Sequence, residues 1–209
     1  MNSIESLGLH ELTLPFGQVR ALTRTFGLGL HLVVGPNGIG KTSLLRAIAG
    51  ALSPMTGVIR LGDVPMKRHS DRVLLAPGAP PAIPWLRAGM LIDFVTSLYP
   101  SSRRSLEYRT HVLEQLQLSH AVDAPLGTLS AGMAKKILLA ATLIAAPSVM
   151  LFDEPINEID AASRDALLTL LADYQRDRIM LVSTHHVAPF REMAASMLTL
   201  GETGVPSVS

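Results

Sequence analysis

The sequence has no cysteine, few aromatic residues and almost no net charge. The absence of cysteine among 209 residues excludes disulfides, thiolate metal sites and cysteine nucleophiles, and it fits a cytosolic protein. The formal net charge of +1, without any block of lysine and arginine, gives no electrostatic footprint for a nucleic-acid partner. Aromatic residues make up only 4% of a chain that is 48% hydrophobic, a balance that favours a parallel sheet buried under helices on both faces.

No uninterrupted apolar segment is long enough to span a membrane. The most apolar run, Ile137 to Phe152, is broken by Thr142, Pro147 and Ser148. A membrane helix needs about 20 consecutive apolar residues, so we expect a buried helix, a turn and a buried strand here. The start of the chain, Met1 to His10, has neither the basic nor the apolar section of a secretory signal. We therefore expect that the chain does not itself cross a bilayer.

What the sequence does contain is a glycine-rich phosphate-binding pattern at residues 35–42. It reads Gly35-Pro36-Asn37-Gly38-Ile39-Gly40-Lys41-Thr42. The apolar segment Leu30–Val34 before it predicts a strand, and Ser43–Ala49 after it predicts a helix, which is the context that this motif needs. In such a loop Lys41 reaches the β- and γ-phosphates and Thr42 offers a hydroxyl to Mg²⁺. An ordinary glycine-rich turn is the disfavoured alternative, so we predict a nucleotide-binding protein.

Two adjacent carboxylates, Asp153 and Glu154, follow the apolar segment Ser148–Phe152. A hydrophobic strand that delivers an aspartate beside a phosphate-binding loop is a common way to hold Mg²⁺. Because side chains alternate along a strand, the two carboxylates are expected to differ in role. One serves the metal through Thr42 and water, and the other faces the γ-phosphate as a base. The alternative is a solvated strand end.

Two further segments end or begin with polar groups suited to a nucleotide. Ser130 and its small neighbours open a helical run at Ala134–Ala146, where they form either an anion site or a simple helix cap. The apolar segment Ile179–Thr184 ends in His185 and His186. A histidine at the carboxyl end of a strand in an open α/β sheet points into the ligand crevice, although a lone histidine is more often structural.

The rest of the chain predicts short strands, helices and one proline-rich loop, Ala76–Trp85. The last residues, Gly201–Ser209, are expected to form a loose tail. The other predicted elements are strands at Leu12–Leu14, Val19–Leu22, Thr56–Leu61 and Val73–Leu75, and helices at Ala88–Leu98 and Ser102–Leu118.

Taken together, these motifs resemble the ATP-binding cassette (ABC) nucleotide-binding domain over nearly the whole chain. The matches are Walker A at Gly35–Thr42, the signature motif (usually written LSGGQ) at Leu129–Met133, Walker B at Val149–Glu154, the D-loop at Asn157–Asp160 and the switch histidine at His185. The resemblance implies an α/β fold of the P-loop NTPase class. It comprises an ABC-type ATPase core with a mostly parallel sheet, an antiparallel β subdomain and a small helical subdomain that carries the signature. One such domain would span residues 1–209, with its core in 1–85 and 129–200, the helical insert at about 86–130 and a tail at 201–209.

The resemblance also implies a role for each matched residue. Lys41 and the loop amides would hold the phosphates of ATP, while Thr42 and Asp153 would hold Mg²⁺. Glu154 would polarise the attacking water and His185 would contact the γ-phosphate. The nucleotide-binding residues implied in this way are Phe16, Gly35, Pro36, Asn37, Gly38, Ile39, Gly40, Lys41, Thr42 and Ser43.

A second cassette, an identical copy, is implied as a partner. Ser130, Ala131 and Gly132 would bind the γ-phosphate held by that copy, and Asp160 would line the interface. The protein would then be an ATP-hydrolysing subunit that powers translocation through a separate membrane permease, on the cytoplasmic face of the cell membrane. The signature followed by Lys135 and Lys136 is similar to the signatures of the branch that contains drug, antibiotic and ion exporters. This similarity favours export.

Two other classes of ABC protein are alternatives. A soluble ABC ATPase of a cofactor-assembly or regulatory complex remains open. The DNA-repair and chromosome ATPases need a long coiled coil between Walker A and signature, and residues 43–128 show no sustained heptads.

Four positions depart from the family pattern or have two interpretations. Gly78 stands where the family carries a glutamine that touches Mg²⁺, and Ala131 replaces the first signature glycine. Phe16-Gly17 lies where the family often has Tyr-Gly, whose ring stacks on adenine. Because the segment between Phe16 and the loop is a few residues shorter, a core phenylalanine is the alternative. Trp85 is a candidate contact for a permease, but we favour a core position for it.

Overall fold

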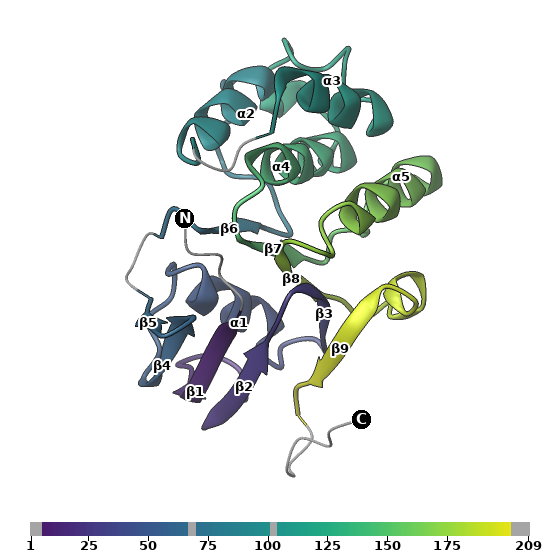
Figure 1. The fold of residues 1–209 in the computed structure, drawn as a ribbon. Helices are drawn as coiled ribbons and strands as arrows, with labels where there is room; N and C mark the ends of the chain where they lie inside the picture. The colour runs from purple at the N-terminus through teal and green to yellow at the C-terminus, as the bar shows by residue number, and fades with distance from the viewer. Residues whose placement is uncertain (1–5, 67–69, 101–103, 202–209) are drawn as a thin grey trace.

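The computed structural model describes residues 6–66, 70–100 and 104–201 (Figure 1). At its centre lies a five-stranded sheet in the order β6-β7-β8-β3-β9, in which every neighbouring pair is parallel. The strands of this sheet are β3 (Gly29–Val34), β6 (Val73–Ala76), β7 (Val149–Asp153), β8 (Ile179–Ser183) and β9 (Ala194–Thr199).

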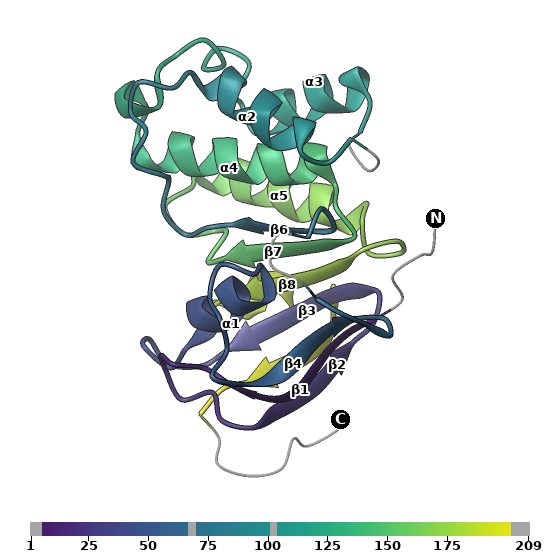
Figure 2. The same ribbon diagram turned by 90° about the vertical axis from the view of Figure 1, so that its left-hand side faces the viewer.

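A second, antiparallel sheet has the strand order β2-β1-β4-β5. Its strands are β1 (Leu7–Thr13), β2 (Leu22–Phe26), β4 (Thr56–Leu61) and β5 (Val64–Pro65). Figure 2 shows this sheet and helix α1 (Lys41–Ile48) on one side of the parallel sheet, with α4 (Ala131–Ala145) and α5 (Ala161–Ala172) on the other side. Helices α2 (Ala88–Ser97) and α3 (Leu106–Gln115) lie beyond α4.

The alternation of side chains along the central strands produces two separate cores. Leu32, Phe152 and Val182 pack with apolar residues of α2 to α5. Their odd-numbered neighbours, such as Val33 and Leu151, pack instead with α1 and the antiparallel sheet. Strands β3, β7 and β8 are therefore buried on both faces along their whole length. This arrangement confirms the predicted fold class.

The predicted strand at Val19–Leu22 is wrong, because β2 begins only at Leu22. The chain turns before that point, where Leu14 N–H donates to Val19 O at 3.1 Å. Ala21 then adopts a left-handed backbone with φ of 46°, which a continuous strand does not accommodate.

The sequence did not predict α5, β9 or the short strand β5. Asp160, which is predicted to line an interface, caps α5 by accepting a hydrogen bond from Ser163 N–H at 2.8 Å. Helix α4 begins three residues before the predicted start, at Ala131. Helix α3 begins at Leu106, where Ser105 caps it; the predicted start at Ser102 lies outside the described part of the chain, as do residues 202–209 of the predicted tail.

Two aromatic side chains lie at the surface. Trp85 is 75% exposed at the end of the proline-rich loop, so the expectation that it belongs to the core is wrong. A loop with so many prolines has few backbone donors and stays at the surface, and it carries Trp85 with it. Phe16 is 63% exposed, which also removes the alternative that it is a core residue.

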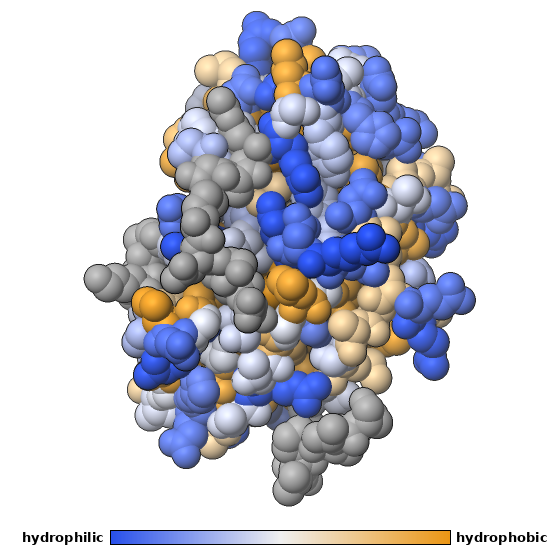
Figure 3. Space-filling model, viewed as in Figure 1, coloured by the Kyte–Doolittle hydropathy of each residue, from blue (hydrophilic) through white to orange (hydrophobic). Residues whose placement is uncertain are grey.

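One face of the molecule carries both hydrophobic and hydrophilic residues (Figure 3). On the face drawn in Figure 3, hydrophobic residues gather in small groups between larger hydrophilic areas. Across the described ranges, no helix has the length and apolar character to cross a membrane.

Candidate nucleotide-binding site

The register of the parallel sheet brings three strand ends side by side. Asp153, the last residue of β7, pairs with Ser183, the last residue of β8, and Ser183 pairs with Val33 of β3. Strand β3 continues directly into the glycine-rich loop, which leads into α1. The carboxyl ends of these strands therefore meet at one edge of the sheet, where ligands bind in open α/β folds.

The glycine-rich loop has the backbone that its sequence predicts. Gly40 is the cap of α1 and has φ of 115°, a left-handed conformation that favours glycine. Gly40 has no side chain with which to cap the helix, so the first N–H groups of α1 remain directed toward the loop. The exposed tip of the loop consists of Pro36, Asn37 and Gly38, whereas Ile39 is buried and Ser43 is half-buried.

Lys41 lies folded over the loop and is only 7% exposed. Its Nζ donates to Gly35 O at 2.7 Å and to Pro36 O at 3.2 Å. The same Nζ lies 3.8 Å from Glu154 Oε1. The ammonium group is thus held between the loop and the second carboxylate by short contacts that it can exchange for those of an anion.

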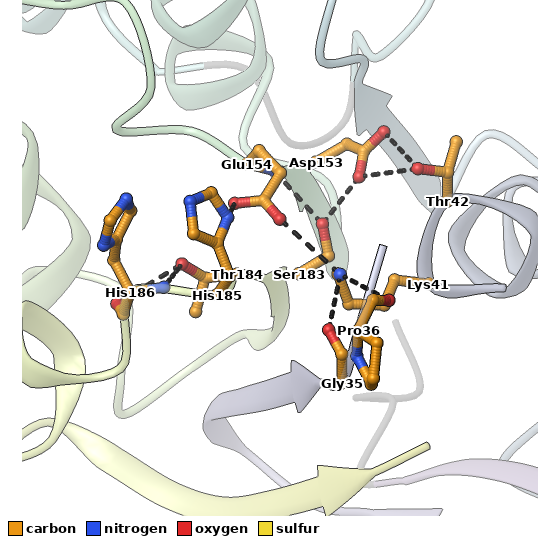
Figure 4. A network of polar contacts seen from close by, with 10 residues as sticks. All are labelled: Gly35, Pro36, Lys41, Thr42, Asp153, Glu154, Ser183, Thr184, His185 and His186. Atoms are coloured by element: carbon orange, nitrogen blue, oxygen red, sulfur yellow. Dashed lines mark hydrogen bonds and ion pairs between the residues drawn. The ribbon is translucent and has the colours of Figure 1, made fainter. Parts of the chain in front are cut away.

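Asp153 and Glu154 point to different partners, as Figure 4 shows. The carboxylate of Asp153, which is 8% exposed, accepts from Thr42 Oγ1 at 2.9 Å and from Ser183 Oγ at 2.6 Å. Glu154 follows the end of β7 with φ of 48° and turns toward Lys41 and His185. Its Oε2 lies 3.1 Å from His185 Nδ1.

His185 and His186 occupy different surroundings. The two rings lie close together, with centroids 3.9 Å apart. The backbone N–H of His186 donates to Thr184 Oγ1 at 2.9 Å, which turns its ring away from Glu154 (Figure 4). Only His185 therefore contacts the carboxylate pair.

The oxygens of Thr42 and Asp153 form a donor set that suits a small hard cation. Mg²⁺ is usually held by one or two protein oxygens together with phosphates and waters. The two side chains are already joined by the 2.9 Å hydrogen bond. Among the described residues, no cluster of three or more histidine, aspartate or glutamate side chains could hold a metal ion by itself.

Gly78 lies directly beside the first carboxylate. A Cβ atom at this position would lie 3.4 Å from Asp153 Oδ2, which is ordinary van der Waals contact. The backbone of Gly78 is not among those with positive φ, so a side chain would be accommodated. The space next to Asp153 is thus open only because Gly78 has no side chain.

Phe16 and Gly17 belong to a turn that packs on the phosphate-binding loop. Gly17 has φ of 80°, and a Cβ there would lie 2.5 Å from Gly40 Cα. Gln18 N–H donates to Ile39 O at 2.8 Å. The exposed ring of Phe16 is therefore carried next to the loop, despite the short connecting segment.

The signature residues begin α4 and are not joined to the phosphate-binding loop. Ser130 caps the helix by accepting from Met133 N–H at 3.2 Å; within the described residues no hydrogen bond links Ser130 to the loop. Ser130 and Ala131 are exposed. Gly132 faces the other way, because a Cβ on it would lie 2.3 Å from Glu158 O.

Two lysines of α4 face the acidic segment that follows Glu154. Lys136 Nζ lies 3.3 Å from Asp160 Oδ2 and donates to Ser163 Oγ at 2.9 Å. The hydrogen bonds from Ser163, first that of its N–H and then that of its hydroxyl, hold the pKa of Asp160 well below its usual value, with help from Lys136. Lys135 is 2% exposed, and burial lowers its pKa. Glu158, Glu154 and Asp153 oppose that shift by their negative charge.

Sequence reasoning missed Ser183 and the contact of Gly132 with Glu158. A polar residue at the end of the apolar run Ile179–Ser183 was visible as a signal, but its partner depends on the register of β7 and β8. The contact of Gly132 depends on how α4 packs, and no local pattern in the sequence indicates it.

The fold is that of a P-loop NTPase. The family described as "ABC transporter" matches residues 28–157, more than half of the 209 residues. This chain belongs to that ABC transporter family.

Curated relatives agree with this assignment, and a solved structure agrees with the fold. An "Uncharacterized ABC transporter ATP-binding protein YxlF" of Bacillus subtilis (strain 168) is 32% identical over 73% of this chain and 52% of the relative. A "Zinc import ATP-binding protein ZnuC" of Pseudomonas syringae pv. syringae (strain B728a) is 31% identical over 72% of this chain and 55% of the relative. A solved "Structure of ATP binding subunit of ABC transporter" has a TM-score of 0.82 at 19% identity, covering 93% of this chain and 85% of that one.

The chain spans about half the length of the curated relatives it matches. A relative named for import is among them, so the predicted exporter branch is not confirmed.

Proposed function

We propose that this chain is the ATP-binding and ATP-hydrolysing subunit of an ABC transporter. The observation that carries the proposal is the convergence in Figure 4: a buried lysine over a glycine-rich loop, a hydroxyl joined to a carboxylate, and a second carboxylate beside a histidine. These groups come from segments far apart in the sequence, and they are the parts that phosphoryl transfer from ATP to water requires.

The residues divide the task according to their contacts. Lys41 exchanges its loop carbonyls for the β- and γ-phosphates, which the free N–H groups at the start of α1 also bind. Thr42 and Asp153 would hold Mg²⁺, which neutralises charge on the phosphates when bound. Glu154 accepts a proton from the attacking water, and His185 keeps the Glu154 side chain turned toward the site. Phe16 offers a ring to adenine.

Two surfaces fit the partners that the proposal requires. Ser130 and Ala131 are exposed at the start of α4, and the side chain of Asp160 is 53% exposed, so a second cassette has access to them. A permease would dock on an exposed apolar surface that includes Trp85, one face of α2 and Leu98, which directly follows this helix. Besides Trp85, the surface consists of Met90 (56% exposed) and Phe94 (61%) of α2, and Leu98 (51%).

The proposed place of work is the cytoplasmic face of a membrane, where the permease holds the chain. Export is the proposed direction, and it is supported only by the likeness of residues 130–136 to exporter signatures. The relative named for zinc import shows that similar chains occur in importers.

The test uses Glu154→Gln, which keeps shape and hydrogen bonding but removes the base. We expect nearly unchanged ATP binding and hydrolysis slowed by roughly 10²–10⁴-fold. With hydrolysis blocked, closed dimers should accumulate in Mg-ATP, as read by size-exclusion chromatography with light scattering. Adding Ser130→Arg should abolish the dimers, and Lys41→Ala, the control for binding, should abolish tight ATP binding.

Parental hydrolysis by Glu154→Gln would remove this residue from catalysis. A strictly monomeric Glu154→Gln protein in saturating ATP would contradict self-pairing and indicate a different partner cassette.

A further inference from the structure

Ser183 places its hydroxyl between the two carboxylate residues of the site. Its Oγ donates to Asp153 Oδ1 at 2.6 Å and accepts from the backbone N–H of Glu154 at 3.1 Å. The residue is fully buried at the end of β8, with 0% exposure. A hydroxyl-to-carboxylate distance of this length is typical of a strong, charge-assisted hydrogen bond.

We propose that Ser183 is a positioning residue that fixes the Asp153 carboxylate in the orientation in which it would bind Mg²⁺. This inference rests on the proposed function. Ser183 does not itself reach the ligand, because it is fully buried. It acts through Asp153, as partners of metal ligands commonly do.

Two hydroxyl groups from different elements hold the carboxylate. Thr42, on α1, donates to Oδ2 at 2.9 Å, and Ser183, on β8, donates to Oδ1 at 2.6 Å. Thr42 Oγ1 also lies 3.1 Å from Oδ1, so Oδ1 contacts both hydroxyl groups and Oδ2 only that of Thr42. Because a carboxylate oxygen has about two acceptor positions, Oδ2 keeps one for a cation. Rotation of the carboxylate about its last bond would break both hydrogen bonds, so the pair defines its plane.

Because Gly78 has no side chain, the orientation of the Asp153 carboxylate depends more strongly on Ser183. On that side of Asp153 a Cβ would be 3.4 Å from Oδ2, but glycine supplies no group to support the carboxylate. The hydrogen bonds that orient Asp153 come from Thr42 and Ser183. Thr42 also has to turn a lone pair toward Mg²⁺, so Ser183 is the support that does not share its hydroxyl with the ligand.

A purely structural role for the hydroxyl predicts a different outcome. The backbone N–H of Glu154 also donates to Ser183 O at 3.0 Å. Removal of the hydroxyl therefore leaves that N–H with a partner, and the loss falls on Asp153. The effect should appear in the metal-dependent part of nucleotide binding and not in binding as a whole.

The experiment measures the affinity for AMP-PNP, a non-hydrolysable ATP analogue, by calorimetry in Mg²⁺ and in EDTA. For Ser183→Ala we expect the gain in affinity that Mg²⁺ gives to fall about tenfold, the lower end for partners of metal ligands. Affinity in EDTA should stay within about twofold of the parent. Ser183→Thr, which keeps a hydroxyl, should retain the gain. Ser196→Ala, which removes a hydroxyl bonded to His31 in the neighbouring strand, is the matched control and should also retain it.

A Ser183→Ala protein that keeps the parental Mg²⁺ gain would overturn the inference and leave the proposed function standing. Equal losses in Mg²⁺ and in EDTA would overturn it as well, because they indicate general disruption. If Ser183→Ala does not fold, Ser183→Cys replaces it. The thiol is a weak donor of similar shape, so this variant should lose most of the gain, and full retention would refute the role. Failure of the parent to bind AMP-PNP in either buffer would refute the proposed function along with it.

Discussion

Gly132, in the first turn of α4, has no room for a side chain, and this makes Gly132→Ala a sharp test of the structure. A Cβ here would lie 2.3 Å from the carbonyl oxygen of Glu158, whereas ordinary contacts begin at 3.4 Å. The obstacle is backbone and not the end of a flexible side chain. Helix and loop must therefore separate by about 1 Å to admit one methyl group.

The expected size of the effect combines two opposing terms. Overpacking of this kind costs about 1–3 kcal/mol. Alanine is up to about 1 kcal/mol better than glycine inside a helix, which offsets part of this loss. The net destabilisation should be about 1–2 kcal/mol, which lowers Tm by roughly 2–8 °C for a chain of this size. Circular dichroism melts of the nucleotide-free protein measure it directly.

Gly78→Ala is the matched control, because this glycine also lies at the site and also lacks a positive φ. Its Cβ would make a 3.4 Å contact with Asp153, so stability should change by less than about 0.5 kcal/mol. If Gly132→Ala melts at or above the temperature of Gly78→Ala, the close packing of α4 on the loop is refuted.

Two further predictions concern Mg²⁺ and pH. Gly78→Gln should fold normally, since the site admits a Cβ. The amide oxygen of the new side chain beside Asp153 should strengthen the Mg²⁺ dependence of AMP-PNP binding. Unfolding of this variant, or an unchanged Mg²⁺ dependence, would show that the loop is misplaced. Burial lowers the pKa of His31 below its usual value of 6.5, a shift that the Gly27 carbonyl opposes and Arg24 reinforces. Because the unfolded chain then binds the proton more readily, the contribution of His31 to stability is complete above about pH 6.5 and is lost as the pH falls below it. His31→Gln should therefore lose less Tm than the parent between pH 7.5 and 5.5, and parallel losses would contradict this reasoning.

The central sheet and the loop were predictable because their signals lie in consecutive residues. The segment Gly35–Thr42 combines strand, glycines and helix start within one short range, and Val149–Asp153 reads as a buried strand by its composition alone. Strand β9 gave no such signal, since its pattern of small and polar residues, Ala194–Thr199, follows no hydrophobic face.

The prediction that Trp85 belongs to the core was wrong for a different reason. The size of the side chain favours burial, but the prolines around it keep the loop out of the core. The loop, and not the residue type, therefore determines that Trp85 is exposed. Two contacts at the site could not be predicted from the sequence either. That Asp153 meets Ser183, and that Gly132 meets Glu158, depends on strand register and helix packing between segments far apart in the chain. The individual roles of Lys41 and the signature residues stay predictions.

The lysines of α4 have a consequence for how the molecule deforms. Lys136 is 6% exposed and bonded to Asp160 and Ser163, and Lys135 is buried facing the charges around Glu158. If α4 slid along the segment Glu154–Asp160, the ammonium groups of Lys135 and Lys136 would be separated from their anions while still buried. Unpaired charges are unfavourable in a protein interior. The helix start and the Glu154–Asp160 segment are thus latched in one relative position. We therefore expect a displacement of α4 at Ser130 to be accompanied by a displacement of the segment that carries Asp160.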